Sequence, residues 1–304
     1  MTMPGTTLDG EQLGSLPGDQ AEVLLRARRL ASLRLLWCRP INMLGTLLVL
    51  TVLVVALVGH LVAPYPPTIN NYGSSFLAPS PQHLFGTDQV GRDVFSRVLC
   101  GASTAMEVVL VVVGFGAAFG TILGLIAGYV GGWTDELLMR LTDIFLALPV
   151  LVLAIAIATV LGPSLGHTML ALAVLWWPWY TRLIRGQVLA LREREYIEAA
   201  KAVGVPTIRI MWRHLLPNAF GPLLVQISLD CGYALLAASS LSFIGLGMQQ
   251  PDPDWGLMIN DAQPYIHSSW WVGTFPGLAI LLAVIGFNLL GDVFGEMQEA
   301  RRSR

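Results

Sequence analysis

The sequence predicts an all-α membrane protein, and three observations carry that prediction. Of its 304 residues, 54% are hydrophobic and only 12% are charged, which is about half the charge of a soluble domain. Long apolar runs recur along the chain, and several reach the roughly 20 residues that a helix needs to cross a bilayer. The net charge of −2 conceals a clustering of arginines in a few segments. The chain as a whole is slightly acidic, and nucleic acid is not a natural partner for it.

The first 40 residues are predicted to form a cytoplasmic tail that leads into the membrane. Residues 1–25 are polar and lack periodicity, so we expect them to be poorly ordered. Between residues 26 and 39, arginines alternate with leucines, a pattern typical of a basic amphipathic segment on an anionic leaflet. The apolar run at 41–63 is too long for the core of a cleavable signal peptide. We interpret it as the first transmembrane helix, roughly 34 Å long at 1.5 Å per residue.

Five further apolar runs follow a predicted extracytoplasmic loop at 64–105. The second and third spans are predicted at 108–130 and 137–161, with Pro149 kinking the third. The fourth, at 165–181, is short and ends in the aromatic cluster 176–180, which suits a membrane interface. The fifth and sixth are predicted at 220–246 and 276–293. The chain would thus have six transmembrane helices, with a core over 106–296 and a cytoplasmic tail over 297–304.

The distribution of positive charge predicts the orientation, because cytoplasmic loops retain arginine and lysine. With the N-terminus in the cytoplasm, all but two of the 18 lysines and arginines fall on the inner side. The two exceptions are Arg92 and Arg97, and each lies near an aspartate, Asp88 or Asp93. Both termini are therefore predicted to be cytoplasmic, and the fourth span is needed to keep the basic cluster at 182–213 inside.

The segment at 198–217, in the basic part of the chain, predicts two short helices joined by a tight turn. Ala199 and Ala200 leave one side of the first helix without bulk, and Gly204 supplies the reversal of the chain. Pro206 stands where a second helix would begin, and Pro217 is predicted to end that helix. We interpret this segment as a helical elbow between two spans.

Three motifs, in order along the chain, resemble one known family. The segments REREYIEAAKAVG at 192–204 and HLLPN at 214–218 resemble the EAA loop of bacterial ABC-importer permeases. The segments FGTDQVGRDVFSR at 85–97 and LSFIGLG at 241–247, with PDWG at 253–256, are similar to signatures of the C-type subunit of dipeptide, oligopeptide and nickel permeases. The similarity continues to FNLLGD at 287–292 and covers residues 34–292. His214 departs from the general pattern, in which many permeases have isoleucine.

This resemblance implies a type I ABC-importer permease architecture with a cytoplasmic EAA coupling loop at 185–217. The residues that would couple the subunit to a partner ATPase are Glu198, Ala199, Ala200, Gly204, Leu216 and Pro217. The implied assembly is a heterodimer with a B-type permease subunit, two cytoplasmic ATPases that bind ATP and Mg, and an extracytoplasmic substrate-binding protein. It would lie in the bacterial inner membrane and carry dipeptides or oligopeptides, with nickel chelates and haem or its precursors as alternatives.

The chain carries no motif of its own for ATP hydrolysis. Its only lysine, Lys201, is followed by alanine and is not preceded by glycine, so no phosphate-binding Gly-Lys-Ser/Thr loop is present. Cys38, Cys100 and Cys231 are too far apart to indicate a disulfide framework or a metal site. We therefore assign this chain no catalytic residue, metal or cofactor, and energy would come from partner subunits.

Within the predicted spans, glycines and two acids suggest further roles. A glycine recurs at every fourth position of the second span, and this spacing allows close approach of another helix, in the subunit's own bundle rather than in a second permease. These glycines are Gly116, Gly120, Gly124 and Gly128. Asp230 could line the translocation path and meet a peptide amine, or it could be a buried structural aspartate. Asp143 is expected to pair with Arg140, three residues earlier on the same helix face.

In the loops, the sequence favours structural roles. Thr87 or Asp88 is expected to cap a helix with an apolar stripe that braces the second span, rather than to contact a binding protein. The acids Asp252, Asp254 and Asp261 could meet a basic rim on such a protein. The segment 162–166 fits a Gly-x-Ser-x-Gly nucleophile motif, but that motif needs a strand-to-helix turn, and here it joins two predicted spans.

Two functions of other classes compete with an ABC permease. A secondary transporter would need no ATPase and would show broken spans in two related halves, and no such duplication is visible in the sequence. An intramembrane serine hydrolase would need a serine and a histidine facing each other, and Ser103 or Ser164 with His167 is a poor set. Uptake driven by a proton gradient without ATP would favour the first of these.

Overall fold

A computed structural model describes residues 40–302, so the predicted tail and amphipathic lead-in at 1–39 lie outside the described residues. The described residues are mainly helical, and the one strand-like pairing among them is an isolated bridge between Thr87 and Asp93. The long helices are α3 Pro40–Val62, α4 Val94–Val130, α5 Gly132–Leu146, α6 Val150–Leu161, α7 Leu165–Leu191, α10 Leu216–Phe243 and α12 Trp271–Arg302. The short elements are η1 Tyr72–Ser74, α8 Glu195–Ala202, α9 Thr207–Ile210, the π-helical turn Met211–Leu215, α11 Trp255–Ala262 and η3 Gln263–Tyr265.

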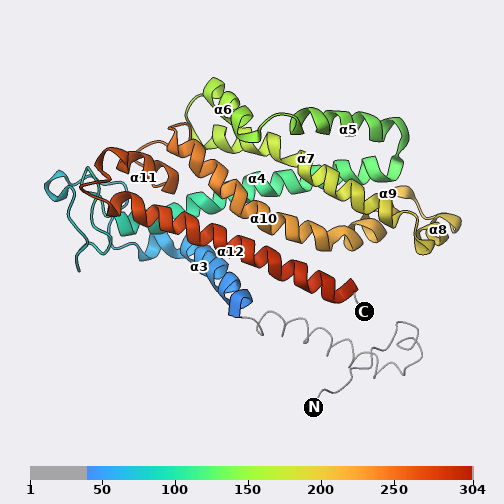
Figure 1. Cartoon of the computed structure of the whole chain (residues 1–304), viewed down its shortest axis with the longest axis horizontal. Helices are drawn as coiled ribbons and strands as arrows, with labels where there is room; N and C mark the ends of the chain where they lie inside the picture. The colour runs from blue at the N-terminus through green and yellow to red at the C-terminus, as the bar shows by residue number, and fades with distance from the viewer. Residues whose placement is uncertain (1–39, 303–304) are drawn as a thin grey trace, which may run out of the picture.

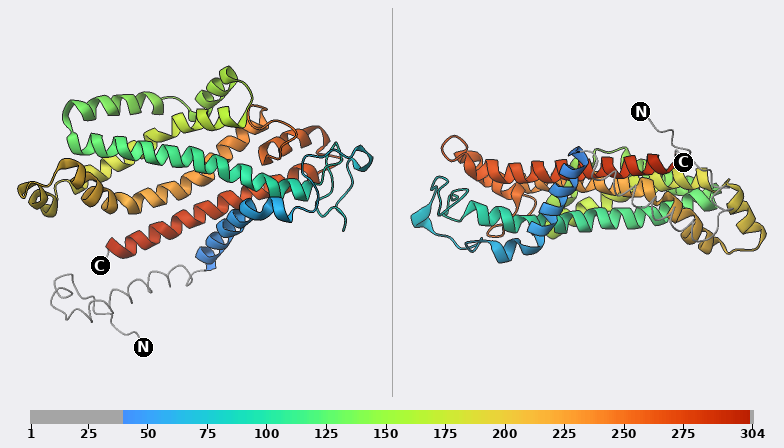
Figure 2. Two further views of the ribbon diagram at one scale, coloured as in Figure 1. Left: turned by 180° about the vertical axis from the view of Figure 1, so that it is seen from behind. Right: turned by 90° about the horizontal axis from the view of Figure 1, so that it is seen from below.

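The long helices form one elongated bundle (Figure 1). α4 and α7 pack along each other, α10 lies against α7, α4 and α12, and α3 packs on α12 and α4. The elbow formed by α8 and α9 lies at one end of the bundle, and α11 and the loop at 64–93 lie at the other. The views in Figure 2 show the same separation of the two ends. Anything that acts on the elbow must therefore act through the helices to reach the opposite loops.

Among residues 40–302, four helical stretches are long and apolar enough to cross a membrane. They are α3, α4, the continuous helix Thr207–Phe243 and the part of α12 at Trp271–Glu299. α5 and α6 would count as a fifth span together, but they are bent by 81° at the break before Val150. Pro149 lies in this break, where the kink was predicted, because proline removes a backbone donor and disfavours the α conformation of the preceding residue. Four or five of the six predicted spans are thus supported. α7, which contains the predicted fourth span, is not among the helices that are long and apolar enough.

The interior of the bundle is apolar, and so is much of its outer surface. α3 presents a long exposed face of leucine, valine and isoleucine, and α12 exposes several leucines beside it. Exposed leucines of this kind are unfavourable in water but match the hydrocarbon of a bilayer. These faces are therefore suited to contact with lipid.

The second span begins earlier than its hydropathy indicates. α4 begins at Val94, and the Asp93 side chain accepts a hydrogen bond from the Ser96 backbone N–H, 2.8 Å away. The prediction that Thr87 or Asp88 caps this helix is wrong, since both residues lie in the preceding turn. The first 14 residues of α4, about four turns, escaped the hydropathy pattern because polar residues interrupt it there.

Candidate functional site

The elbow at residues 195–215 has a defined geometry at its turn. Gly204 has a φ of +78°, which glycine adopts without strain. The Gly204 N–H donates to the carbonyl of Lys201 and the Val205 N–H donates to the carbonyl of Ala200, each at 3.0 Å. This pair of bonds is the Schellman arrangement, which closes the C-terminus of α8. Pro206 then caps α9, as predicted for the start of the second helix.

Apolar anchors hold the elbow against the bundle. Ile197 and Ala200 of α8 are buried, and so are Ile210 and Leu215 on the second arm. All four belong to the main hydrophobic core. The ammonium of Lys201 lies 5.6 Å from the ring centroid of Tyr129, near the end of α4, within range of a cation–π interaction. The elbow is therefore part of the packed subunit rather than a loose loop.

The elbow also exposes four apolar or aromatic side chains that no other described residue buries. Val203 and Ile208 are 79% and 65% exposed, and Tyr196 and Trp212 are about half exposed. We call these four side chains the elbow face. Of the residues singled out from the sequence, Glu198, Ala199, Gly204 and Pro217 are exposed, Leu216 is half-buried and Ala200 is buried. Ala200 therefore contributes to packing of the elbow, whereas the others are accessible to a partner.

The prediction that Pro217 ends the second helix is wrong. From Thr207 to Phe243 the chain is one continuous helix, and Pro217 lies in the first turn of α10. The π-helical turn at Met211–Leu215 precedes it, and this wider turn accommodates the ring and the missing N–H of the proline. The elbow is thus joined without a break to a membrane-spanning helix.

The glycines of α4 pack against α7. A Cβ added at Gly116 would lie 2.9 Å from Trp176 Cβ, and one at Gly124 would lie 2.7 Å from the Thr181 carbonyl oxygen. Gly120 is equally tight, since an added Cβ would lie 2.6 Å from Tyr180 Cβ. Gly128 meets Val188 one turn further on, at 2.8 Å. This glycine face therefore packs α4 closely against α7 within the subunit's own bundle.

Ion pairs fix α5 at the end of the bundle nearest the elbow. Arg185 of α7 donates to Asp135 of α5 over 2.6 Å, and Arg182 pairs with Asp143. The prediction that Asp143 pairs with Arg140 is wrong, because Arg140 pairs with Glu136 one turn earlier. The partner of Asp143 is Arg182, 39 residues away in sequence. Only the packing of α5 on α7 brings these two side chains together.

Asp230 lies in a buried polar cluster between α10 and α7. The Gln226 side-chain N–H donates to Asp230 Oδ1 over 2.9 Å. Tyr180 and Trp176 also face this carboxylate, but neither the Tyr180 hydroxyl nor the Trp176 indole nitrogen meets hydrogen-bond geometry with any described residue. Asp230 Oδ2 is likewise buried and without such a partner among the described residues.

Most of the aromatic residues of α7, which the sequence suggested for a membrane interface, are packed inside the bundle. Trp176, Trp177 and Tyr180 are buried, and only Trp179 is substantially exposed. The spacing of four residues between Trp176 and Tyr180 was the signal that both face the same neighbour. That neighbour is Asp230 of α10. The cluster therefore brings together residues to which the sequence had suggested separate roles.

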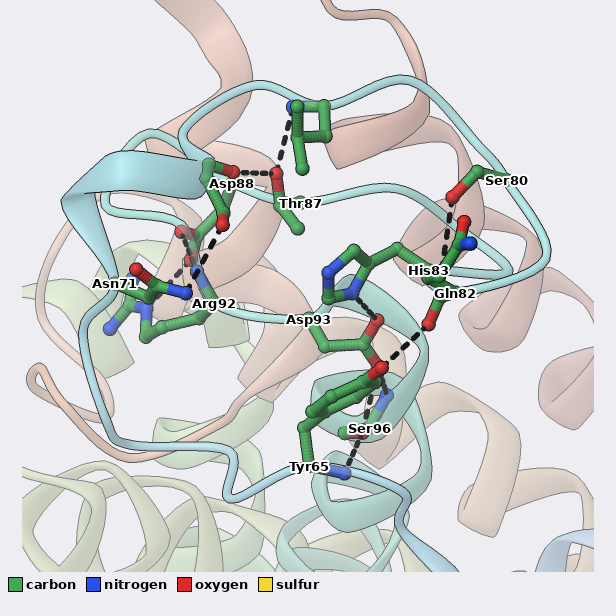
Figure 3. A network of polar contacts seen from close by, with 12 residues as sticks. Tyr65, Asn71, Ser80, Gln82, His83, Thr87, Asp88, Arg92, Asp93 and Ser96 are labelled. Atoms are coloured by element: carbon green, nitrogen blue, oxygen red, sulfur yellow. Dashed lines mark hydrogen bonds and ion pairs between the residues drawn. The ribbon is translucent and has the colours of Figure 1, made fainter.

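At the other end, the motif at 85–97 builds a polar network that fastens the loop (Figure 3). Arg92 Nε donates to Asp88 Oδ2 over 2.7 Å, and both side chains are almost fully buried. His83 Nδ1 lies 2.9 Å from Asp93 Oδ1, so Asp93 caps α4 and also holds the loop. Arg97 donates to the carbonyls of Pro67 and Pro251 at 2.6 and 2.9 Å. These contacts favour the bracing role over direct contact with a binding protein.

Two of the three loop acids proposed to meet a basic rim are engaged within the subunit. Asp254 is buried and accepts a hydrogen bond from the Leu257 N–H, which caps α11. Burial raises the pKa of the Asp254 carboxyl, and that hydrogen bond acts in the opposite direction. Asp261 pairs with the Gln250 side chain, and burial likewise raises its pKa. The proposal of a rim contact is therefore wrong for Asp254, which points inward.

The Gly-x-Ser-x-Gly segment joins two helices, as expected. Gly162 ends α6, Ser164 begins α7, and His167 Nδ1 bonds to the Gly162 carbonyl oxygen at 2.9 Å. Ser103 does face a histidine, but it is His60 of α3, at 3.1 Å, and the Ser103 hydroxyl donates to the Cys100 carbonyl. These contacts link neighbouring helices and do not resemble a nucleophile elbow.

Comparison with known proteins identifies the family. Residues 120–304 match the binding-protein-dependent transport system inner membrane component family. The chain is 45% identical over 255 residues to the dipeptide transport system permease protein DppC of Escherichia coli, covering 82% of this chain and 85% of that protein. It is 43% identical to DppC of Alkalihalophilus pseudofirmus, covering 82% of each. The glutathione transport system permease protein GsiD of Escherichia coli is 42% identical and covers 82% of this chain and 83% of that protein.

A solved structure shares the fold. An inward-facing form of the MetNI methionine ABC transporter superposes with a TM-score of 0.54 at 18% identity, covering 66% of this chain and 95% of that one. At 18% sequence identity, this similarity shows a shared fold and nothing further.

Proposed function

Because the chain belongs to the binding-protein-dependent inner membrane components, we propose that it is the permease subunit of an ATP-driven importer of dipeptides or oligopeptides. The observation that carries the substrate class is its 45% identity to a dipeptide permease over most of both chains. In this proposal the subunit forms a heterodimer with a B-type permease, receives substrate from an extracytoplasmic binding protein and is driven by two ATPases. Nickel chelates and haem precursors are the alternative cargo.

The elbow face is the proposed docking surface for the ATPase. Exposure of four apolar side chains to water at the end of a well-packed bundle is unfavourable. Their burial in a complementary groove of a partner would lower the free energy of the complex. The charged residues on the same segment, including Glu198, would surround that contact and orient it. Docking at this end requires the elbow to be cytoplasmic, in agreement with the charge distribution, and both termini would then be cytoplasmic as well.

The continuous helix Thr207–Phe243 is the proposed lever. A push on α9 passes along this helix to α10, since the helix has no break at Pro217. α10 packs on α4 and α7, which the glycine face holds together. ATPase closure would therefore move α4, α7 and α10 as a unit and switch access from one side of the membrane to the other.

The docking assignment is tested by a charge on the elbow face. We expect Ile208→Asp to release the ATPases, because burying an unpaired carboxylate in an interface costs at least ~2 kcal/mol, or about 30-fold in affinity. The measurement is co-purification of the ATPases with the tagged subunit. Ile266→Asp is the matched control, since Ile266 is 57% exposed and directly follows η3, which comes after α11 at the opposite end of the bundle. Equal release by both variants, or by neither, would remove the elbow face as the docking surface.

Asp230 is the proposed contact for the peptide amine. Its Oδ2 atom, the Tyr180 hydroxyl and the Trp176 indole are buried polar groups that lack a partner among the described residues, and a bound ammonium could satisfy the carboxylate. We expect Asp230→Asn to assemble normally but to reduce the preference for free dipeptides over N-acetylated ones, measured as the ratio of the two uptake rates. Asp143→Asn, which removes an exposed carboxylate, should keep the ratio of the unmodified subunit. Loss of assembly in Asp230→Asn would instead assign this residue a structural role.

The proposed function is tested in cells that lack the gene and require an amino acid for growth. A plasmid copy should restore growth when that amino acid is supplied as a dipeptide, and should make no difference when it is supplied free. If the copy restores only the uptake of a nickel chelate or a haem precursor, the peptide assignment is wrong and the permease assignment stands.

A further inference from the structure

An apolar crevice of about 380 Å³ opens between α3 and α12, with α4 as its floor. α3 contributes Leu48, Val52 and Val55, and α12 contributes Phe275 and Ala279. The remaining lining residues are Thr51, Phe85, Phe95, Val98, Leu99, Ala102, Trp255, Leu278 and Leu282. The crevice thus lies between two helices that are long and apolar enough to cross the membrane, in the half nearest the loop at 64–93.

Close glycine contacts mark the two ends of the crevice. At one end, Gly286 of α12 approaches α3 so closely that an added Cβ would lie 2.9 Å from Leu48 Cβ. At the other end, an added Cβ at Gly59 of α3 would lie 2.5 Å from the Leu99 carbonyl oxygen of α4. α3 is therefore packed on α12 at the first point and on α4 at the second. Between these points it spans a gap that its own side chains do not fill.

The chemistry of the lining selects an apolar occupant. Thr51 is the one residue with a side-chain hydroxyl in the lining, and that hydroxyl donates to the Leu47 carbonyl of its own helix over 2.8 Å. Water in the crevice would find few hydrogen-bond partners, and a peptide would find none of the placed polar groups that orient such a ligand. An empty space of this size would forfeit dispersion contacts along all of its walls.

Three aromatic rings close the end of the crevice beside the loop. Phe85, from the loop motif, stacks on Phe275 with ring centroids 3.9 Å apart, and it meets Phe95 edge-on at 4.9 Å. Leu278 and Leu282 of α12 line the crevice and are themselves about half exposed, so the crevice opens on the apolar outer surface of this helix. In a bilayer, an opening on such a surface is accessible to hydrocarbon chains.

We propose that this crevice binds one acyl chain of a membrane phospholipid. The chain enters from the leaflet beside the loop at 64–93, fills the gap between α3 and α12, and ends near the point where these helices meet. It would link α3 to the bundle and place lipid against Phe85, so that the motif at 85–97 is braced by a lipid as well as by its polar network. The inference depends on the bilayer environment of the subunit and not on the substrate that it carries.

The test uses the complete transporter in vesicles of phosphatidylethanolamine and phosphatidylglycerol. A fraction of the phosphatidylethanolamine carries a photoreactive diazirine in the middle of one acyl chain, and labelled peptides are mapped by mass spectrometry. We expect labelling of residues 48–55 and 275–282 to exceed that of other exposed faces of α3 and α12 several-fold. Ala279→Phe fills the crevice and should abolish that excess. Leu281→Phe is the matched control, because Leu281 lies on the same helix, is 51% exposed and does not line the crevice.

A second variant separates the effect of filling the crevice from an effect of misfolding. Val52→Phe fills the same space from α3, and each variant is first compared with the unmodified complex by size-exclusion profile. Labelling spread evenly over the lipid-facing surface, or unchanged in both filled variants, would overturn the proposal. Crosslinks from the crevice to a helix of another subunit would also overturn it, since a protein segment would then be the occupant.

Discussion

A Gly204→Val subunit is expected to reach the membrane and assemble with its partner permease, but to lose most of its transport. Gly204 has a φ of +78°, and a left-handed conformation costs an L-residue about 1–2 kcal/mol, more when the side chain is β-branched. A cost of that size lowers the population of the correctly folded elbow by a factor of roughly 5–30. The measurement is dipeptide uptake together with co-purification of the ATPases.

The control for this variant follows from the space around the turn. A Cβ at Gly204 would meet no atom within 4 Å, so the strain comes from the backbone angle alone. Gly204→Asn should therefore retain most of the transport, because asparagine tolerates the left-handed region better than other residues. If Val and Asn behave alike, the positive φ is not what the elbow requires.

A Gly120→Ala subunit is expected to be destabilised by about 1–3 kcal/mol, although alanine usually stabilises a helix. The added methyl group would collide with the carbonyl oxygen of Trp177 and lie 2.6 Å from Tyr180 Cβ. α4 and α7 would have to move apart along the whole glycine face, since the same helices are in contact at Gly116 and Gly124. The measurement is thermal unfolding of the purified subunit in nanodiscs.

Gly114→Ala on the same helix should have the opposite sign. Gly114 is exposed, and an added Cβ there would meet nothing within 4 Å. Alanine should therefore stabilise the helix by about 0.5–1 kcal/mol relative to glycine. Equal effects at positions 114 and 120 would mean that the close packing of α4 on α7 does not depend on the glycine face.

The sequence was sufficient where a feature depends on residues close together along the chain. A glycine at every fourth position marks one helix face, Pro149 marks a break, and Gly204 followed by Pro206 marks a turn between two helices. In each case the physical cause is local, either the absence of a Cβ or the restricted backbone of proline.

The sequence was insufficient where the outcome depends on helix packing or on a local backbone geometry that periodicity does not show. Asp143 pairs with Arg182 rather than with Arg140 because α5 folds back along α7. Pro217 continues a helix rather than ending it, because a π-helical turn precedes it. Asp254 faces inward because it caps α11. The hydrophobic periodicity of the chain contains none of this information.

The most direct test of the account is uptake by the complete transporter in proteoliposomes, with labelled dipeptide and binding protein on one side and the ATPases on the other. We expect accumulation that requires ATP and Mg on the ATPase side, persists without a proton gradient, and is lost in Gly204→Val. Accumulation driven by a proton gradient in the absence of ATP would contradict the assignment of this chain as an ATP-coupled permease.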